Sequence, residues 1–120
     1  MASVGKSPGA RLREMIGART TIAAGVYDSL SATLAEQAGF DALHITGFGV
    51  EASLLGTPDM GMVTLTELAD VVRRITAAID IPVICDVDIG FGEIESVART
   101  VRLISQAGAA AMHIEDAGPP

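Results

Sequence analysis

The sequence predicts an α/β fold with a parallel sheet. Short apolar runs alternate along the chain with segments in which apolar residues recur every three or four positions, the pattern of strands alternating with amphipathic helices. The short runs are apolar at successive positions, as in parallel strands buried on both faces. Two closures fit this order: an open doubly wound sheet, or an incomplete (β/α)8 barrel.

The elements follow from local signals. The expected strands are Thr20–Gly25, Ala42–Thr46, Pro82–Val87 and Ala109–Ile114. The expected helices are Ser29–Ala38, a segment opened by a capping box of Thr64 and Glu67, and a segment from Ile94 to Ile104 closed by Gly108. The glycine-rich stretch Gly47–Val63 is expected to be a loop. Residues 1–18 are expected to form a tail and a short helix, with the strand–helix units in residues 19–120.

Composition excludes several classes of function. The 120 residues suffice for one domain, and a net charge of −7 argues against nucleic-acid binding, because phosphates need basic partners. No apolar run approaches the ~18 residues of a membrane span, so no membrane partner is expected. The single cysteine, Cys85, forms no internal disulfide and suits a reducing compartment, which favours a cytoplasmic location.

Polar side chains gather where the expected strands end. They are His44 and Thr46 after the second strand, Asp86 and Asp88 after the third, and His113 and Glu115 after the fourth. The carboxyl ends of parallel strands share one rim, where sites are built, and Asp59 in the long loop can reach it. Carboxylates brought together need a cation, and oxygen ligands without cysteine favour Mg²⁺ or Mn²⁺.

Simpler interpretations exist for each of these residues. Asp86 and Asp88 would also serve as caps of the following helix, and strand histidines such as His44 are often structural. Residues 47–52 formally fit a Gly-x-Gly-x-x-Ala dinucleotide fingerprint, but the acids expected at a later strand end are missing. Backbone N–H groups that receive a substrate carboxylate explain the same glycines. Cys85 should face the helices as a small core residue.

Several motifs together resemble the isocitrate lyase/phosphoenolpyruvate mutase superfamily. They are Gly25-Val-Tyr-Asp-Ser-Leu-Ser31, Thr46-Gly47, Leu55-Gly56-Thr57-Pro58-Asp59, Asp86-Val-Asp-Ile-Gly-Phe-Gly92 and His113-Ile-Glu-Asp116. The resemblance runs from about Leu12 to Asp116. It implies a (β/α)8 TIM barrel, of which the first four strand–helix units are present.

The resemblance also implies roles for individual residues. Asp88 matches the direct Mg²⁺ ligand, and Asp59, Asp86 and Glu115 match acids that hold the waters of the metal. The residues matched to substrate binding, or placed at the same rim, are Tyr27, Asp28, His44, Thr46, Gly47, Phe48 and His113.

The implied reaction is cleavage of a carbon–carbon bond in a 2-hydroxy or 2-oxo di- or tricarboxylate, as in methylisocitrate lyase or dimethylmalate lyase. Oxaloacetate decarboxylases and phosphoenolpyruvate or phosphonate mutases are alternatives on the same scaffold. Methylisocitrate lyases carry tyrosine in place of His44 and glycine in place of Phe48. We therefore expect Phe48 to crowd the carboxylate pocket and to alter the substrate.

Lyases of this family carry a Lys-(Lys/Arg)-Cys-Gly-His loop after the Ile-Glu-Asp strand, and its cysteine acts as the general acid. The sequence ends at Pro119-Pro120, so we expect that group beyond Pro120 and the 120-residue piece to be inactive alone. A truncated, non-catalytic protein is a further possibility. The resemblance implies a homotetramer for the full-length form.

A half-barrel has two open sheet edges and an unburied inner face. We therefore expect the 120-residue chain by itself to be marginally stable or to self-associate. Sedimentation across a range of concentrations, with a dye that binds exposed apolar surface, checks this. A monomer that melts cooperatively and binds no dye would contradict the expectation.

Overall fold

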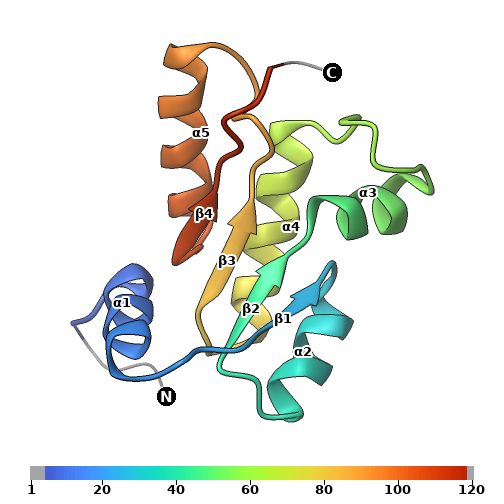
Figure 1. Ribbon diagram of the computed structural model, residues 1–120. Coiled ribbons are helices and arrows are strands. Elements are labelled where there is room, and N and C mark those ends of the chain that lie inside the picture. Colours follow the sequence, from blue (N-terminus) through green and yellow to red (C-terminus); the bar gives the residue numbers. More distant parts are fainter. Residues whose placement is uncertain (1–4, 119–120) are drawn as a thin grey trace.

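A four-stranded parallel sheet, in the order β1-β2-β3-β4, organises the molecule (Figure 1). The computed structural model describes residues 5–118. The strands are β1 (Ala23–Val26), β2 (Ala42–Ile45), β3 (Val83–Asp86) and β4 (Ala111–His113). The helices are α1 (Pro8–Ala18), α2 (Ser29–Gln37), α3 (Gly47–Leu55), α4 (Leu65–Ala78) and α5 (Ile94–Gln106). The predicted parallel α/β order is therefore confirmed.

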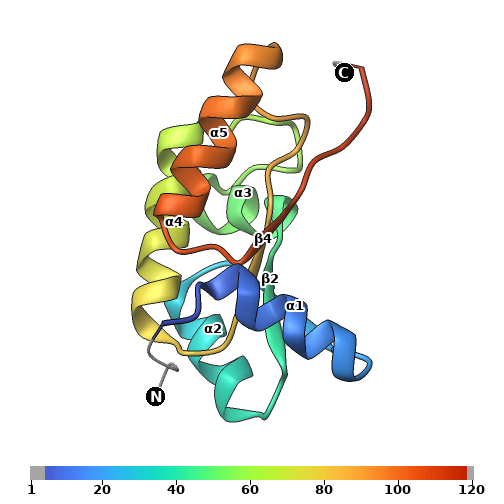
Figure 2. The ribbon, with the colours of Figure 1, turned by 90° about the vertical axis from the view of Figure 1, so that its left-hand side faces the viewer.

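The two faces of the sheet differ in what covers them. Helices α2, α4 and α5 lie along one face, and Figure 2 shows the other face without such a layer among residues 5–118. Alternation along the strands sorts the side chains accordingly. Leu43, Ile45 and Cys85 are fully buried under the helices. His44 and Asp86 alternate with them and lie on the open face, partly exposed.

Helix starts follow the capping signals. Thr64 accepts the N–H of Glu67, and the Glu67 carboxylate accepts the N–H of Thr64, which is the predicted capping box of α4. A second capping box, which the sequence analysis did not identify, joins Asp28 and Ser31 at the start of α2. Both helices thereby satisfy N–H groups that have no partner inside the helix.

The predicted loop Gly47–Val63 was wrong over its first half, which forms helix α3. Two glycines in the first turn lower helix propensity, so the sequence pattern favoured a loop. The structure supplies both boundaries: Thr46 accepts the N–H of Gly49, and Gly56 ends the helix with a left-handed φ of 68°. The remaining loop runs from Gly56 to Thr64.

Smaller differences concern the strand ends and the N-terminal segment. β1 begins and ends later than the predicted run, and β4 is shorter than predicted. The predicted short helix is α1, which packs below the amino ends of the strands. Its Leu12 is buried, and Arg11 donates to the carbonyl of Asp80 at 2.9 Å. Residues 1–4 of the predicted tail, and residues 119–120, lie outside the described part.

No helix within residues 5–118 is long and apolar enough to cross a membrane.

The core lies between the sheet and helices α2, α4 and α5. It is built from aliphatic side chains such as Leu43, Val72, Ile75 and Ile104, all fully buried. Because burial of aliphatic surface is the main favourable term in folding, this layer holds the strand ends in place.

Replacing a core isoleucine tests this arrangement against a matched surface position. Ile75→Ala should lower the free energy of unfolding by about 2–5 kcal/mol, because it leaves a cavity under the sheet. Ile94→Ala removes the same atoms from a side chain that is 84% exposed and should change it by no more than about 0.5 kcal/mol. Urea unfolding of the full-length protein carrying either substitution measures the difference; equal effects would refute the packing described.

Candidate metal and carboxylate site

Three carboxylates meet at the carboxyl end of the sheet. Asp86 ends β3, Asp88 follows it by two residues, and Glu115 follows β4. One oxygen from each lies within 4.8 Å of the others. Such a group of like charges fits a divalent cation that prefers oxygen ligands, as the sequence predicted.

The segment after β3 is folded tightly enough to turn Asp88 back towards Asp86. Asp88 adopts a left-handed φ of 49°, and its N–H donates to Oδ1 of Asp86 at 2.9 Å. Gly90 and Gly92 also have positive φ, and a Cβ at either would lie 2.6 Å from a side chain of α5. The glycines of the Asp-x-Asp-x-Gly-x-Gly motif are thus required by backbone conformation and by packing.

Helix α5 and β4 secure this segment from the sides. The buried hydroxyl of Thr100 donates to the carbonyl of Gly90 at 2.7 Å. The N–H of Glu115 donates to the carbonyl of Asp88 at 2.7 Å, which extends the pairing of β3 and β4. Two acids of the cluster are therefore tied together through the backbone.

The pKa of the Asp88 carboxyl group shows the effect of burial and of repulsion between the like charges. Burial, followed by the charges of Asp86, Asp59, Glu115 and Glu51, raises its pKa to about 6. A cation would reverse this effect, because it favours the ionised form.

Asp59, the fourth predicted metal acid, lies on the loop between α3 and α4. It is exposed and is not among the three acids that meet within 4.8 Å. It lines a cleft of about 410 Å³ together with Asp88, Phe91 and Glu115. The cleft has the size of a site for a small metabolite.

Helix α3 points its first turn at the acids. A Cβ on Gly47 would lie 3.2 Å from Oδ2 of Asp86 and 3.3 Å from Oδ1 of Asp88. Glycine therefore lets the backbone approach the carboxylates closely. The first N–H groups of a helix have no partner within it, and Gly49 already donates to Thr46. Gly47 and Phe48 lie in the same first turn, and the first N–H groups of a helix are the kind that bind anions in proteins.

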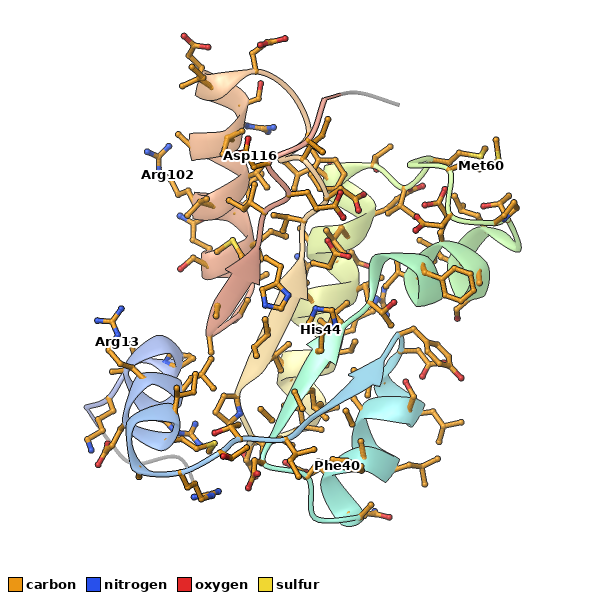
Figure 3. All side chains as sticks on the ribbon, in the orientation of Figure 1. Arg13, Phe40, His44, Met60, Arg102 and Asp116 are labelled. Atoms are coloured by element: carbon orange, nitrogen blue, oxygen red, sulfur yellow. The ribbon has the colours of Figure 1, made fainter. Side chains whose placement is uncertain are left out.

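Two histidines, His44 on β2 and His113 on β4, contact each other beside the acids. Nε2 of His44 and Nδ1 of His113 are 3.1 Å apart, so one ring donates to the other. Figure 3 shows His44 on the face of the sheet that the helices leave uncovered. Burial and then the neighbouring His113 lower the pKa of His44, against the opposing effect of Asp86. The sequence placed both histidines at strand ends on the acidic rim, and the contact between their rings is a finding of the structure.

Of the other predicted substrate residues, Thr46, Gly47 and Phe48 form the start of α3. Tyr27 packs close to Gly49, whose Cβ would meet the Cβ of Tyr27 at 3.0 Å. Asp28 is engaged as the N-cap of α2. The side chain of Phe48 is 59% exposed, and the crowding expected of it stays a prediction.

Cys85 behaves as a core residue, as the alternation predicted. It is fully buried under the helices. Burial, with the charges of Asp86 and Asp88, raises the pKa of its thiol to about 12, so it remains protonated.

One charged residue beside the site was missed. Glu51 lies on α3, is 2% exposed, and accepts the N–H groups of Met60 and Met62. The only sequence signal was one acid within an otherwise apolar and small-residue stretch. Because that stretch was predicted to be a loop, where acids are usually exposed, the signal did not indicate a buried carboxylate.

The raised pKa of Asp88 predicts how stability depends on pH without metal. Between about pH 4 and 6 the folded state binds more protons at Asp88 than the unfolded state, so this residue lowers the free energy of unfolding as pH rises. Asp88→Asn, which tolerates the left-handed backbone, should therefore gain stability relative to the parent over that window. Saturating Mg²⁺ should abolish the gain.

Chemical denaturation of the two proteins at several pH values, with and without Mg²⁺, measures this. A constant difference from pH 4 to 7 would show that Asp88 titrates normally and is not held among like charges.

Comparison with known proteins agrees with this geometry. The family model described as phosphoenolpyruvate phosphomutase matches residues 12–119. The 2-methylisocitrate lyase of Aeropyrum pernix is 49% identical over 110 residues, covering 91% of this chain and 35% of that protein. The 2,3-dimethylmalate lyase of Eubacterium barkeri is 41% identical over 108 residues, covering 89% of this chain and 37% of that protein.

Solved structures show the same relationship. A crystal structure of 2,3-dimethylmalate lyase matches with a TM-score of 0.88 and 40% identity, over 94% of this chain and 40% of that one. A phosphonopyruvate hydrolase in complex with oxalate and Mg²⁺ matches with a TM-score of 0.90 and 33% identity, over 96% and 41%.

The chain thus spans little more than a third of the length of the curated relatives described here. Its four parallel strands correspond to part of the (β/α)8 barrel of the structures it matches. With a family match over residues 12–119, the chain belongs to the phosphoenolpyruvate phosphomutase family, within the isocitrate lyase/phosphoenolpyruvate mutase superfamily of lyases.

Proposed function

We propose that this chain supplies the metal-binding and carboxylate-binding part of a Mg²⁺-dependent carbon–carbon lyase. The substrate would be a 2-hydroxy or 2-oxo di- or tricarboxylate of the methylisocitrate or dimethylmalate type. The names of the similar lyases support the reaction class. The catalytic acid and the remaining half of the barrel would come from the full-length protein.

One observation carries the proposal: the N-terminus of α3 directly faces the acidic group. The backbone of Gly47 lies so close to Asp86 and Asp88 that an added Cβ would be 3.2 and 3.3 Å from their carboxylate oxygens. An anion-binding helix end and a cation-binding group therefore lie side by side. A carboxylate with a neighbouring oxygen would be held by both at once, which fits 2-oxo and 2-hydroxy acids.

The acids would hold the cation in different ways. Asp88 is the direct ligand in this proposal, because it lies at the centre of the like charges that a cation would neutralise. Asp86 and Glu115 would hold its waters, and Asp59 would close over it from the loop. When bound, Mg²⁺ supplies Lewis-acid stabilisation of the negative charge that develops as the bond breaks.

The neutral groups would orient the substrate. The N–H groups of Gly47 and Phe48 would bind its carboxylate, and Thr46 holds that helix turn in place through Gly49. The lowered pKa of His44 keeps its ring neutral near pH 7. The ring of His44, hydrogen-bonded to His113, would thus present a polar edge to the substrate rather than a charge.

A second candidate is phosphonate chemistry on the same site. The phosphonopyruvate hydrolase bound to oxalate and Mg²⁺ matches with a TM-score of 0.90, the highest value among the structures compared above. Its substrate shares the 2-oxo carboxylate that this site would bind. The reactions are separated by their products, since only phosphonate cleavage releases inorganic phosphate.

Activity of the full-length protein tests the proposal. It should release pyruvate or a related 2-oxo acid from 2-methylisocitrate, dimethylmalate or oxaloacetate in a Mg²⁺-dependent manner. Asp88→Ala should lower kcat/KM by about 1,000-fold or more, because Lewis-acid stabilisation is worth several kcal/mol. Asp80→Asn, which alters an exposed acid at the opposite end of β3, is the control and should be unaffected.

Release of phosphate from phosphonopyruvate, with no cleavage of the carbon acids, would favour the second candidate. Full activity in Asp88→Ala would refute the metal assignment in both.

A further inference from the structure

Glu51 is a buried carboxylate for which the proposed chemistry has no use. It lies in the middle of α3 and is 2% exposed. Burying a carboxylate is costly unless hydrogen bonds compensate for the lost water. Here one oxygen, Oε1, accepts the N–H of Met62 at 2.6 Å and that of Met60 at 3.3 Å. Both donors belong to the loop between α3 and α4.

These two hydrogen-bond donors lie next to a residue of the candidate metal site. Met60 directly follows Asp59, which lines the cleft with Asp88 and Glu115. The loop contains Gly56 and Gly61, both with positive φ, and Asp59 and Met60 are exposed. The Glu51 carboxylate, by accepting the backbone N–H groups of Met60 and Met62, thus restrains the loop immediately beside Asp59.

Glu51 also lies next to the acids on its other side. It lines a narrow cavity with Gly47, Asp86 and Asp88. Asp59 lines the neighbouring cleft with Asp88, and the charges of Glu51 and Asp59 both raise the pKa of Asp88. One side chain therefore connects the helix that would bind the substrate carboxylate, the central acids and the loop that carries the fourth acid.

We infer that Glu51 is a positioning residue, which holds the loop between α3 and α4 so that Asp59 faces Asp88 and strengthens divalent-cation binding. This inference rests on the proposed function, since it assumes a cation at Asp88. A general structural role is the competing explanation: Glu51 would then support the fold equally with or without Asp59.

Two substitutions of similar volume and equal charge separate the hydrogen bonds from the charge. Glu51→Gln keeps an oxygen that accepts both N–H groups, and Glu51→Met fills the same space without that acceptor. Amide hydrogen exchange should show protection of Met60 and Met62 retained in Glu51→Gln and lost in Glu51→Met. Should the methionine variant fail to fold, Glu51→Ala takes its place.

Binding of Mn²⁺ to the full-length protein, followed by electron paramagnetic resonance of the free ion, is the decisive readout. Glu51→Met should bind Mn²⁺ about tenfold or more weakly than Glu51→Gln, the usual effect of losing a residue that orients a metal ligand. When both are combined with Asp59→Asn, the two should bind within about twofold of each other, because the residue through which Glu51 acts is gone.

Equal affinities of the two variants with Asp59 present would overturn the inference. So would a tenfold gap that persists with Asp59→Asn, because Glu51 would then act on the site without Asp59. If the unaltered protein binds no Mn²⁺, or Asp88→Ala binds it as tightly, the metal centre itself falls, and the inference with it.

Discussion

Repulsion among carboxylates at one end of the sheet is the constraint to which the rest of this structure responds. Asp86, Asp88 and Glu115 are brought within 4.8 Å by the ends of two adjacent strands. Without a compensating charge the arrangement is unfavourable, as the raised pKa of Asp88 indicates. A tight turn, two required glycines and a buried threonine nevertheless hold these carboxylates together. The most direct physical explanation is that the site binds a cation.

The elements around the acids supply complementary features. The core layer of α2, α4 and α5 fixes the strands from one side and leaves the polar residues of β2, β3 and β4 on the open face. Helix α3 adds N–H groups where a negative ligand would otherwise be repelled. Cation and anion sites are therefore neighbours because strand ends and a helix N-terminus meet at the same edge, a general property of parallel α/β architecture.

The sequence allowed prediction of those elements and residues for which the residue type and the periodicity of the backbone indicate the same structure. The four strands, the capping box of Thr64 and Glu67, and the burial of Cys85 all follow from period and local signals. Asp86, Asp88 and Glu115 could be placed together because parallel strands end at one rim. The closure into a barrel could not be derived this way, and it rests on family membership.

What the sequence did not reveal depends on tertiary contacts. Helix α3 begins with glycines, whose low helix propensity is outweighed by the cap of Thr46 and by packing against Tyr27. Glu51 could be recognised only after this helix was known, since its partners are nine and eleven residues away in the sequence.

The most direct test of this account is a crystal structure of the full-length protein soaked with Mn²⁺, with anomalous data collected at the manganese absorption edge. We predict an anomalous peak at roughly 2 Å from a carboxylate oxygen of Asp88, near the distance of oxygen ligands from Mg²⁺, with Asp86 and Glu115 around it. No peak at Asp88 under saturating Mn²⁺, or a peak held by other residues, would contradict the claim that these acids form a metal centre.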